Sequence, residues 1–367
     1  MSQDARRHRP NREGTETVTV DGASIHVPSM TAVEQRASMS DLGLDLDEET
    51  QDELLQRVRD TELSDDMREI VQDDGVLGDR DLLLWKWIYH IFGEPLTLNT
   101  VPEEHFQAAR EAASLVAIYI TLIDDIGEKR GDRATFWELS KAPYPEVEPD
   151  WDREDIDRDY AVSTKRVWEA LMERIQSAPR FEEFVEPLMF SIRQSIQGMD
   201  YARLSSDYAS FMNPEETWYF ETQAIGLYLF WNVDLMFSPS FDHDDYQAFR
   251  RITFELQHMW RLGNWIITWQ REVYERDYSA GIIVEALHQG VIDESDLDAL
   301  DEGSVDPEEI IWQIESAGLA EQFVWNWKQR RDKIRERDFG MESLDSDEMV
   351  AKMEWLMQSH FATEGHR

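Results

Sequence analysis

Three carboxylates close together in the chain are the first residues able to do chemistry. The segment Asp124-Asp125-Ile-Gly-Glu128 directly follows an apolar stretch, Ser114–Ile123. In a helix, Asp124 and Glu128 share one face and Asp125 lies beside them. Buried carboxylates are costly unless a cation neutralises them, so this segment predicts a cation site at the inner end of a helix. The alternative is a helix end that emerges into solvent, with Gly127 starting the loop.

A second polar stripe lies later in the chain. Asn264, Thr268 and Glu272 recur every four residues, so they line one side of a helix whose neighbouring residues are apolar. An amide oxygen, a hydroxyl and a carboxylate are hard ligands suited to Mg²⁺, which also binds waters and phosphate oxygens. Arg271, beside the glutamate, is placed to pair with phosphate. In a chain with 77 Asp and Glu, chance alone produces about one match to the first motif and under one to the second.

Together, in this order and on two apolar helices, the motifs resemble those of class I terpene synthases. That family has a DDxxD or DDxxE motif on one inner helix and an [ND]xxx[ST]xxxE motif on a later, facing helix. The resemblance covers about residues 80–367 at the level of helix order, and its specificity lies in the two motifs. It implies an all-α isoprenoid synthase bundle with three Mg²⁺ ions, or Mn²⁺ as the alternative, at the mouth of an apolar cavity.

The resemblance also implies roles for individual residues. The first motif would bind two Mg²⁺ ions through Asp124, Asp125 and Glu128. The second motif would bind the third ion through Asn264, Thr268 and Glu272. Arg271 and Arg367 would contact diphosphate, and Gly226, at a break within a helix, would lie near the reacting carbon. Asp124, Asp125, Gly226 and Arg271 are thus the expected catalytic residues.

The chain departs from the family pattern at two places. Many bacterial members have a diphosphate-sensing Arg four or five residues before the helix break, where this chain has Glu221 and Thr222. That role is therefore in doubt or belongs to another residue. The family ends in an Arg-Tyr pair, whereas no Tyr follows Arg367.

The implied reaction is Mg²⁺-dependent ionisation of a prenyl diphosphate, farnesyl or geranylgeranyl, followed by cyclisation of the carbocation. Aromatic rings stabilise such a cation by about 0.5–2 kcal/mol each. The candidate rings, each of which could equally be ordinary core, are Trp218, Tyr219, Phe220, Phe230, Trp231 and Trp260. Two alternatives remain open: a chain-elongating trans-prenyltransferase on the same fold, and a non-catalytic acidic helical scaffold.

Composition narrows the class of protein further. The 367 residues include 36 Lys and Arg against 77 Asp and Glu, a formal charge of −41, yet 41% are hydrophobic, which is ample for a folded core. So acidic a surface repels nucleic acid and anionic membranes and predicts a halophilic, cytoplasmic protein. The absence of Cys excludes disulfides and thiolate metal sites. A homodimer remains open.

The elements that must position these residues are predicted to be helices. Residues 1–30 form a basic tail, with an alternating segment, Thr15–Val27, that predicts a hairpin, and residues 31–367 form one all-α domain. Pro143–Asp157 and Asp293–Glu309 are predicted as surface loops, and no stretch is a clear membrane span. The predicted helices are Asp47–Arg59, Asp79–Gly93, Pro102–Lys129, Asp152–Ser177, Pro179–Leu204, Pro214–Phe237, Asp242–Asp277, Pro307–Arg337 and Ser346–Phe361.

Overall fold

The computed structural model describes residues 15–20, 23–28, 42–44, 46–71, 77 and 80–363. Apart from one hairpin, this part of the chain is all-α. The hairpin pairs β1 (Thr15–Val20) with β2 (Ala23–Pro28) in antiparallel register, over the segment for which the sequence predicts it. The predicted basic tail before Thr15 and the predicted diphosphate ligand Arg367 lie outside the described residues.

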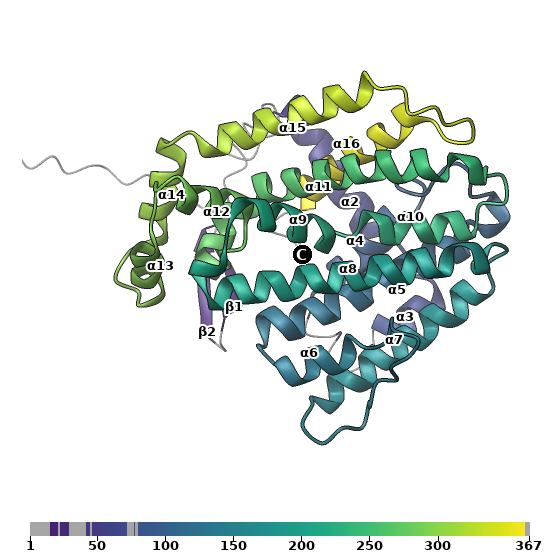
Figure 1. Cartoon of the computed structure of the whole chain (residues 1–367), viewed down its shortest axis with the longest axis horizontal. Coiled ribbons are helices and arrows are strands. Elements are labelled where there is room, and N and C mark those ends of the chain that lie inside the picture. Colours follow the sequence, from purple (N-terminus) through teal and green to yellow (C-terminus); the bar gives the residue numbers. More distant parts are fainter. Residues whose placement is uncertain are drawn as a thin grey trace, which may run out of the picture.

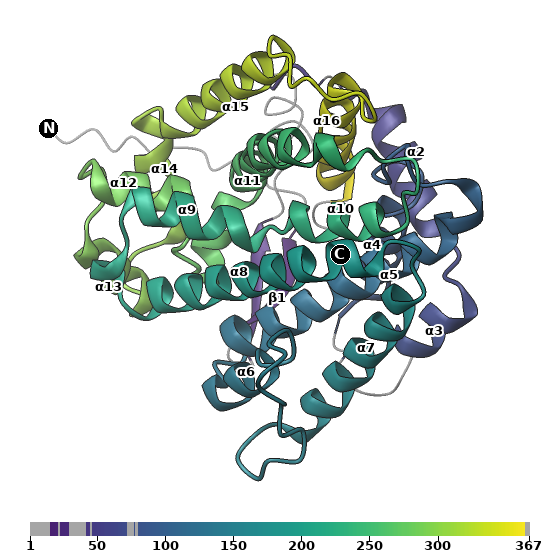
Figure 2. The same ribbon diagram turned by 45° about the vertical axis from the view of Figure 1, so that its right-hand side comes forward.

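Long helices lie side by side and form the body of the molecule (Figures 1 and 2). α8 packs against α9 and α10, α10 against α5, and α11 against α15 and α16. The helices of the first half are α2 (Glu48–Asp60), α3 (Asp65–Val71), α4 (Leu82–Ile91), α5 (Glu103–Asp124), α6 (Arg133–Leu139), α7 (Arg158–Gln176) and α8 (Phe181–Asp207). Those of the second half are α9 (Pro214–Ala224), α10 (Leu227–Met236), α11 (Tyr246–Glu275), α12 (Gly281–His288), α13 (Glu294–Asp301), α14 (Pro307–Ser316), α15 (Leu319–Arg335) and α16 (Ser346–Thr363). Three shorter turns are the π-helix η2 (Asp125–Lys129) and the 3₁₀-helices η3 (Ala209–Phe211) and η4 (His243–Asp245).

α5 is the most enclosed of the long helices that carry the predicted motifs. It begins after Pro102 with two glutamates, which suit the positive end of the helix dipole, and becomes apolar on every side towards its end. The stretch Glu103–Lys129 is long and apolar enough to cross a membrane, but 67% of its most apolar window is buried inside the bundle. That burial fits a core helix of the bundle.

Two glycines with positive φ separate consecutive helices. Gly226, with φ of +77°, separates α9 from α10, and Gly318, with φ of +74°, divides the predicted helix Pro307–Arg337 into α14 and α15.

The predicted loop Asp293–Glu309 is wrong, because it contains α13. Asp293 starts α13 with a reciprocal capping box to Asp296, and such caps stabilise a short helix whose surface is too acidic to show apolar periodicity.

Candidate active site

The end of α5 continues into the bundle surface as a π-helix instead of opening into a loop at Gly127. The wider π turn runs from Asp125 to Lys129, so Glu128 keeps a helical position. Gly127 is required by a close approach: a Cβ there would lie 2.8 Å from Cδ2 of Phe136 on α6. The glycine therefore lets η2 pack directly on α6, which fixes the three carboxylates of the first motif.

Asp125 is neutralised by cations of the protein. Its side chain is buried, and Arg80 donates from Nε to Oδ2 at 2.8 Å and contacts Oδ1 with a terminal nitrogen. The ammonium group of Lys129 lies 3.5 Å from Oδ1. Sequence reasoning missed Arg80, because it lies 45 residues upstream, just before α4, and no local spacing links it to Asp125.

The other two carboxylates of the first motif are not neutralised in this way. Burial and the neighbouring Asp125 raise the pKa of Asp124 to about 6, against the opposing effects of Lys129 and Arg80. Glu128 is accessible to solvent, yet protein flanks it closely enough that desolvation raises its pKa well above the usual value. The charge of Asp124 acts in the same direction. This end of α5 thus holds more negative charge than the protein itself compensates.

The second motif lines one face of α11, as predicted. Arg261 donates from a terminal nitrogen to Oδ1 of Asn264 at 2.9 Å, and the buried Thr268 hydroxyl donates to the Asn264 carbonyl at 2.9 Å. Oε2 of Glu272 is buried and has no hydrogen-bond partner among the described residues. Burial and the charge of Asp277 raise the pKa of Glu272 to about 8. Arg271, adjacent to it, lies 3.4 Å from Glu275 through Nε and Oε1.

Asp277 connects the two motifs electrostatically. It follows the end of α11, where Arg276 adopts a left-handed conformation with φ of +61° and turns the chain. Its charge raises the pKa of Asp124 and Glu128 on the α5 side and of Glu272 on the α11 side. The structure therefore brings the carboxylates of both motifs into one neighbourhood, which we call the acidic site.

A buried ion pair completes the acidic site from α9. A terminal nitrogen of Arg261 lies 3.4 Å from Oε2 of Glu221, and its Nε donates to the Glu221 carbonyl at 2.7 Å. Oε1 of Glu221 has no hydrogen-bond partner among the described residues. Burial raises the pKa of Glu221 to about 8 although Arg261 opposes it, and the charges of Asp277 and Asp124 add to the rise. Sequence reasoning noted Glu221 only because it departs from the family pattern, and it missed Arg261, the partner of Glu221 40 residues later.

The donors of the acidic site fit a divalent cation. Its carboxylates outnumber its cations by six to four, and two of its carboxylate oxygens are buried without a partner. Within the described ranges, no three His, Cys, Asp or Glu side chains are already arranged around a metal position. Mg²⁺ commonly uses one or two carboxylates and completes its shell with waters and phosphate oxygens. The carboxylates are Asp124, Asp125, Glu128, Glu221, Glu272 and Asp277, and the cations are Arg80, Lys129, Arg261 and Arg271.

Gly226 marks the helix break that the sequence predicts. It is buried, and its positive φ ends α9 so that the last carbonyls of that helix lose their helical partners. Arg261 binds the carbonyl of Glu221, and the Ser195 hydroxyl donates to the carbonyl of Ala224 at 3.0 Å. The break therefore lies directly beside the ion pair of the acidic site.

The six predicted pocket aromatics do not lie together. Phe230 and Trp260 meet at 6.2 Å between ring centroids, and Phe92 lies 4.2 Å from Phe230, so these three form one buried cluster. Trp260 is one turn before Asn264 on α11, which places this cluster along the helix from the acidic site.

The remaining four aromatics have other surroundings. Trp231 is fully buried and donates to the Leu96 carbonyl at 3.1 Å, as a core side chain does. Phe220 stacks on Tyr201, and Tyr219 is 52% exposed. Trp218 lines a separate cavity, described below. Comparison with known proteins found no matching family model and no matching curated protein.

Proposed function

We propose that this protein is an enzyme that ionises a prenyl diphosphate in a Mg²⁺-dependent reaction, with the isoprenoid synthase fold of class I terpene synthases. The observation that carries the proposal is the acidic site itself. The charge of Asp277 raises the pKa of carboxylates at the end of α5 and on α11 alike, and Glu221 and Glu272 each keep a buried oxygen without a hydrogen-bond partner among the described residues. A structural ion-pair network would leave no such set of buried carboxyl groups without counter-charges or hydrogen-bond partners.

The residues that would hold Mg²⁺ come from both motifs. Asp124 and Glu128 offer carboxylates on the α5 side, and Asn264, Thr268 and Glu272 offer oxygens on the α11 side. Bound Mg²⁺ supplies neutralisation of the diphosphate charge that develops when the carbon–oxygen bond breaks. Without such ions, this acidic protein would repel its anionic substrate.

Two arginines of α11 supply positive charge from the protein. Arg271 is adjacent to Glu272, and Arg261 lies next to Asn264, so either guanidinium reaches an anion held at the motif. Arg261 is held between Glu221 and Asn264 by three polar contacts, which orients its fork before substrate arrives. This position offers a replacement for the sensing arginine that the sequence lacks at Glu221.

The aromatic cluster would serve the hydrocarbon part of the reaction. Phe92, Phe230 and Trp260 are buried, so water has little access to their ring faces. A ring face stabilises a nearby carbocation and offers no nucleophile that could quench it. The cluster stands one turn along α11 from Asn264, the direction in which a prenyl chain would extend away from its diphosphate.

Product analysis tests this function. The protein is incubated in multimolar KCl with Mg²⁺ and the C10, C15, C20 and C25 prenyl diphosphates, and hydrocarbons or alcohols are identified by gas chromatography and mass spectrometry. We expect turnover of at least one substrate, abolished in Asp125→Ala and Glu272→Ala. Glu302→Ala, an exposed carboxylate remote from the motifs in sequence, is the matched control and should retain activity. A folded protein that consumes none of the substrates contradicts the proposal.

A further inference from the structure

A cavity that shares no lining residue with the acidic site lies between α15 and the helices α9, α11 and α12. Its volume is about 680 Å³, within the range of small-molecule sites. Leu262 and Trp265 line it from α11, whereas Asn264 and Thr268 of the same helix belong to the acidic site. The two sites adjoin at Trp265, whose ring centroid lies 5.8 Å from the guanidinium carbon of Arg261 in the acidic site, but no residue belongs to both.

The middle of this cavity is aromatic. Trp218 and Trp265 stack with their ring centroids 5.3 Å apart and their planes at 26°, and Phe323 meets Trp265 edge-on at 6.0 Å. Gly281 lets the Trp265 ring lie against α12, since a Cβ there would be 2.6 Å from Cζ3 of the ring. The three rings form an ordered apolar wall against which a hydrocarbon chain or a flat ring can pack.

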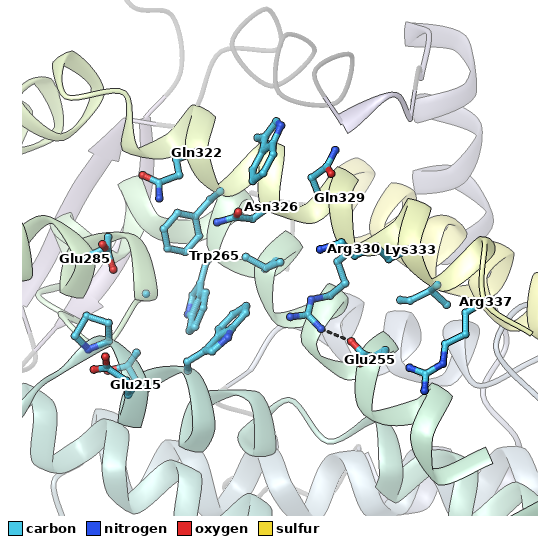
Figure 3. Close-up of a pocket in the computed structure, with 18 of the residues that line it drawn as sticks. Glu215, Glu255, Trp265, Glu285, Gln322, Asn326, Gln329, Arg330, Lys333 and Arg337 are labelled. Atoms are coloured by element: carbon cyan, nitrogen blue, oxygen red, sulfur yellow. Dashed lines mark hydrogen bonds and ion pairs between the residues drawn. The ribbon is translucent and has the colours of Figure 1, made fainter. Parts of the chain in front are cut away.

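One end of the cavity is basic. Arg330, Lys333 and Arg337 project from successive turns of α15 and the residues just after it, and Figure 3 shows them on one side of Trp265. Glu255 pairs with Arg330, so the residues that line this end comprise three cations and one carboxylate, and the exposed Glu336 and Asp338 beside Arg337 lie outside the lining. Within the described part of the chain, neither Lys333 nor Arg337 has a carboxylate within 4 Å.

The other end of the cavity is acidic. Glu215 on α9 and Glu285 on α12 line it, and Figure 3 shows both across the rings from Arg337. The cavity is therefore electrically polarised along its length, in a protein whose formal charge of −41 makes any net positive surface an exception. An anion is attracted to the basic end and repelled from the acidic end, so a ligand with one anionic group can bind in one orientation only.

We propose that this cavity binds an anionic amphiphile, with a phosphate or carboxylate head at Lys333 and Arg337 and its apolar part against Trp218 and Trp265. The two exposed cations supply the head group's counter-charges, and the stacked rings supply the apolar contact area. The inference goes beyond the proposed enzymatic function and does not depend on it, since no residue that lines this cavity belongs to the acidic site.

Calorimetric titration tests the proposal with defined probes. Dodecyl phosphate and dodecanoate, below their aggregation concentrations, distinguish the two head groups, and hexyl phosphate and inorganic phosphate test the apolar contribution. The titrations are made in EDTA and 0.5 M KCl, so that divalent cations do not contribute. Lys333→Glu and Arg337→Glu change the basic end, and Lys328→Glu, on α15 but outside the cavity lining, is the control with the same charge change.

We expect saturable binding of one C12 anion per chain, with affinity falling by up to about fourfold for each methylene removed. Lys333→Glu and Arg337→Glu should each weaken binding at least about tenfold, and Lys328→Glu by less than about twofold. The proposal is overturned if neither C12 anion binds saturably, or if Lys333→Glu and Lys328→Glu bind alike. Inorganic phosphate that binds as tightly as dodecyl phosphate would also overturn it, because the aromatic wall would then contribute nothing.

Discussion

Replacing Glu272 by Gln should make the metal-free protein more stable. Oε2 of Glu272 is buried without a hydrogen-bond partner, and burial together with Asp277 raises the pKa of this carboxyl from 4.5 to about 8. A folded-state pKa above the unfolded one means that stability is lost as pH rises from about 4.5 to 8, and that the penalty is complete above pH 8. At 1.36 kcal/mol per pKa unit the upper bound is about 5 kcal/mol. Relaxation of the protein around the charge and screening by salt reduce this penalty, so we expect Glu272→Gln to raise the free energy of unfolding by about 1–3 kcal/mol.

Urea unfolding at pH 9 in fixed KCl, followed by tryptophan fluorescence, measures this change. In EDTA, Glu272→Gln should exceed the native protein by about 1–3 kcal/mol in free energy of unfolding, and the exposed-site control Glu302→Gln should lie within about 0.5 kcal/mol of it. With Mg²⁺ and inorganic pyrophosphate added, the native protein should gain stability by mass action and the variant should gain much less. A variant that is less stable than the native protein in EDTA would contradict this expectation, because Glu272 would then be a structural residue.

Three further predictions concern the scaffold. Burial raises the pKa of Asp234 from 3.8 to about 7, against the Leu98 N–H that it accepts and the charge of Lys352. Stability should therefore fall between about pH 4 and 7. In urea unfolding, Asp234→Asn should exceed the native protein by about 1 kcal/mol at pH 4.5 and by up to about 4 kcal/mol at pH 8.5, and an equal difference at both values contradicts this. Gly226→Ala should lower the free energy of unfolding by about 1–3 kcal/mol, because φ is +77° and a Cβ there would lie only 2.8 Å from the end of the Leu229 side chain. The loss should exceed that of Gly303→Ala, where φ is +71° but the space is open, and equal losses in thermal unfolding would show that packing against Leu229 does not matter. The melting temperature should rise between 0.2 and 2 M KCl, because salt screens the repulsion within a chain of charge −41, and a flat or falling profile would contradict a halophilic protein.

The sequence predicted the long helices well because their apolar positions recur with helical spacing and their starts carry acidic first turns. α5 and α11 begin within a few residues of the predicted starts. α13 escaped prediction because its stability comes from the cap at Asp293 and two buried leucines rather than from an apolar stripe. The division at Gly318 escaped as well, since apolar residues continue on both sides of it.

The candidate site was predictable only as far as residues lie on the same helix. The spacing of Asp124 with Glu128, and of Asn264 with Glu272, fixes which side chains share a face. The contacts of Arg80 with Asp125 and of Arg261 with Glu221 join residues 45 and 40 positions apart, so they depend on tertiary packing and no local pattern predicts them.

The aromatic residues also show that positions in the sequence do not determine tertiary contacts. Sequence proximity placed Trp218 and Trp260 in one predicted pocket, yet Trp218 lines the cavity beside α15 and Trp260 packs with Phe230. Which way a large ring turns depends on the neighbouring helices, and a single helix does not specify them.

Whether the two motifs form one metal–diphosphate site can be measured directly. Binding of Mg²⁺ and inorganic pyrophosphate is measured by calorimetry for the native protein, Asp124→Asn, Glu272→Gln and the double variant. If both carboxylates hold the same ligand, each single change should abolish most of the binding and the second should add little, with a coupling energy of about 0.5–3 kcal/mol. Strictly additive losses, or a native protein that does not bind Mg²⁺ and pyrophosphate together, would contradict a shared metal–diphosphate site.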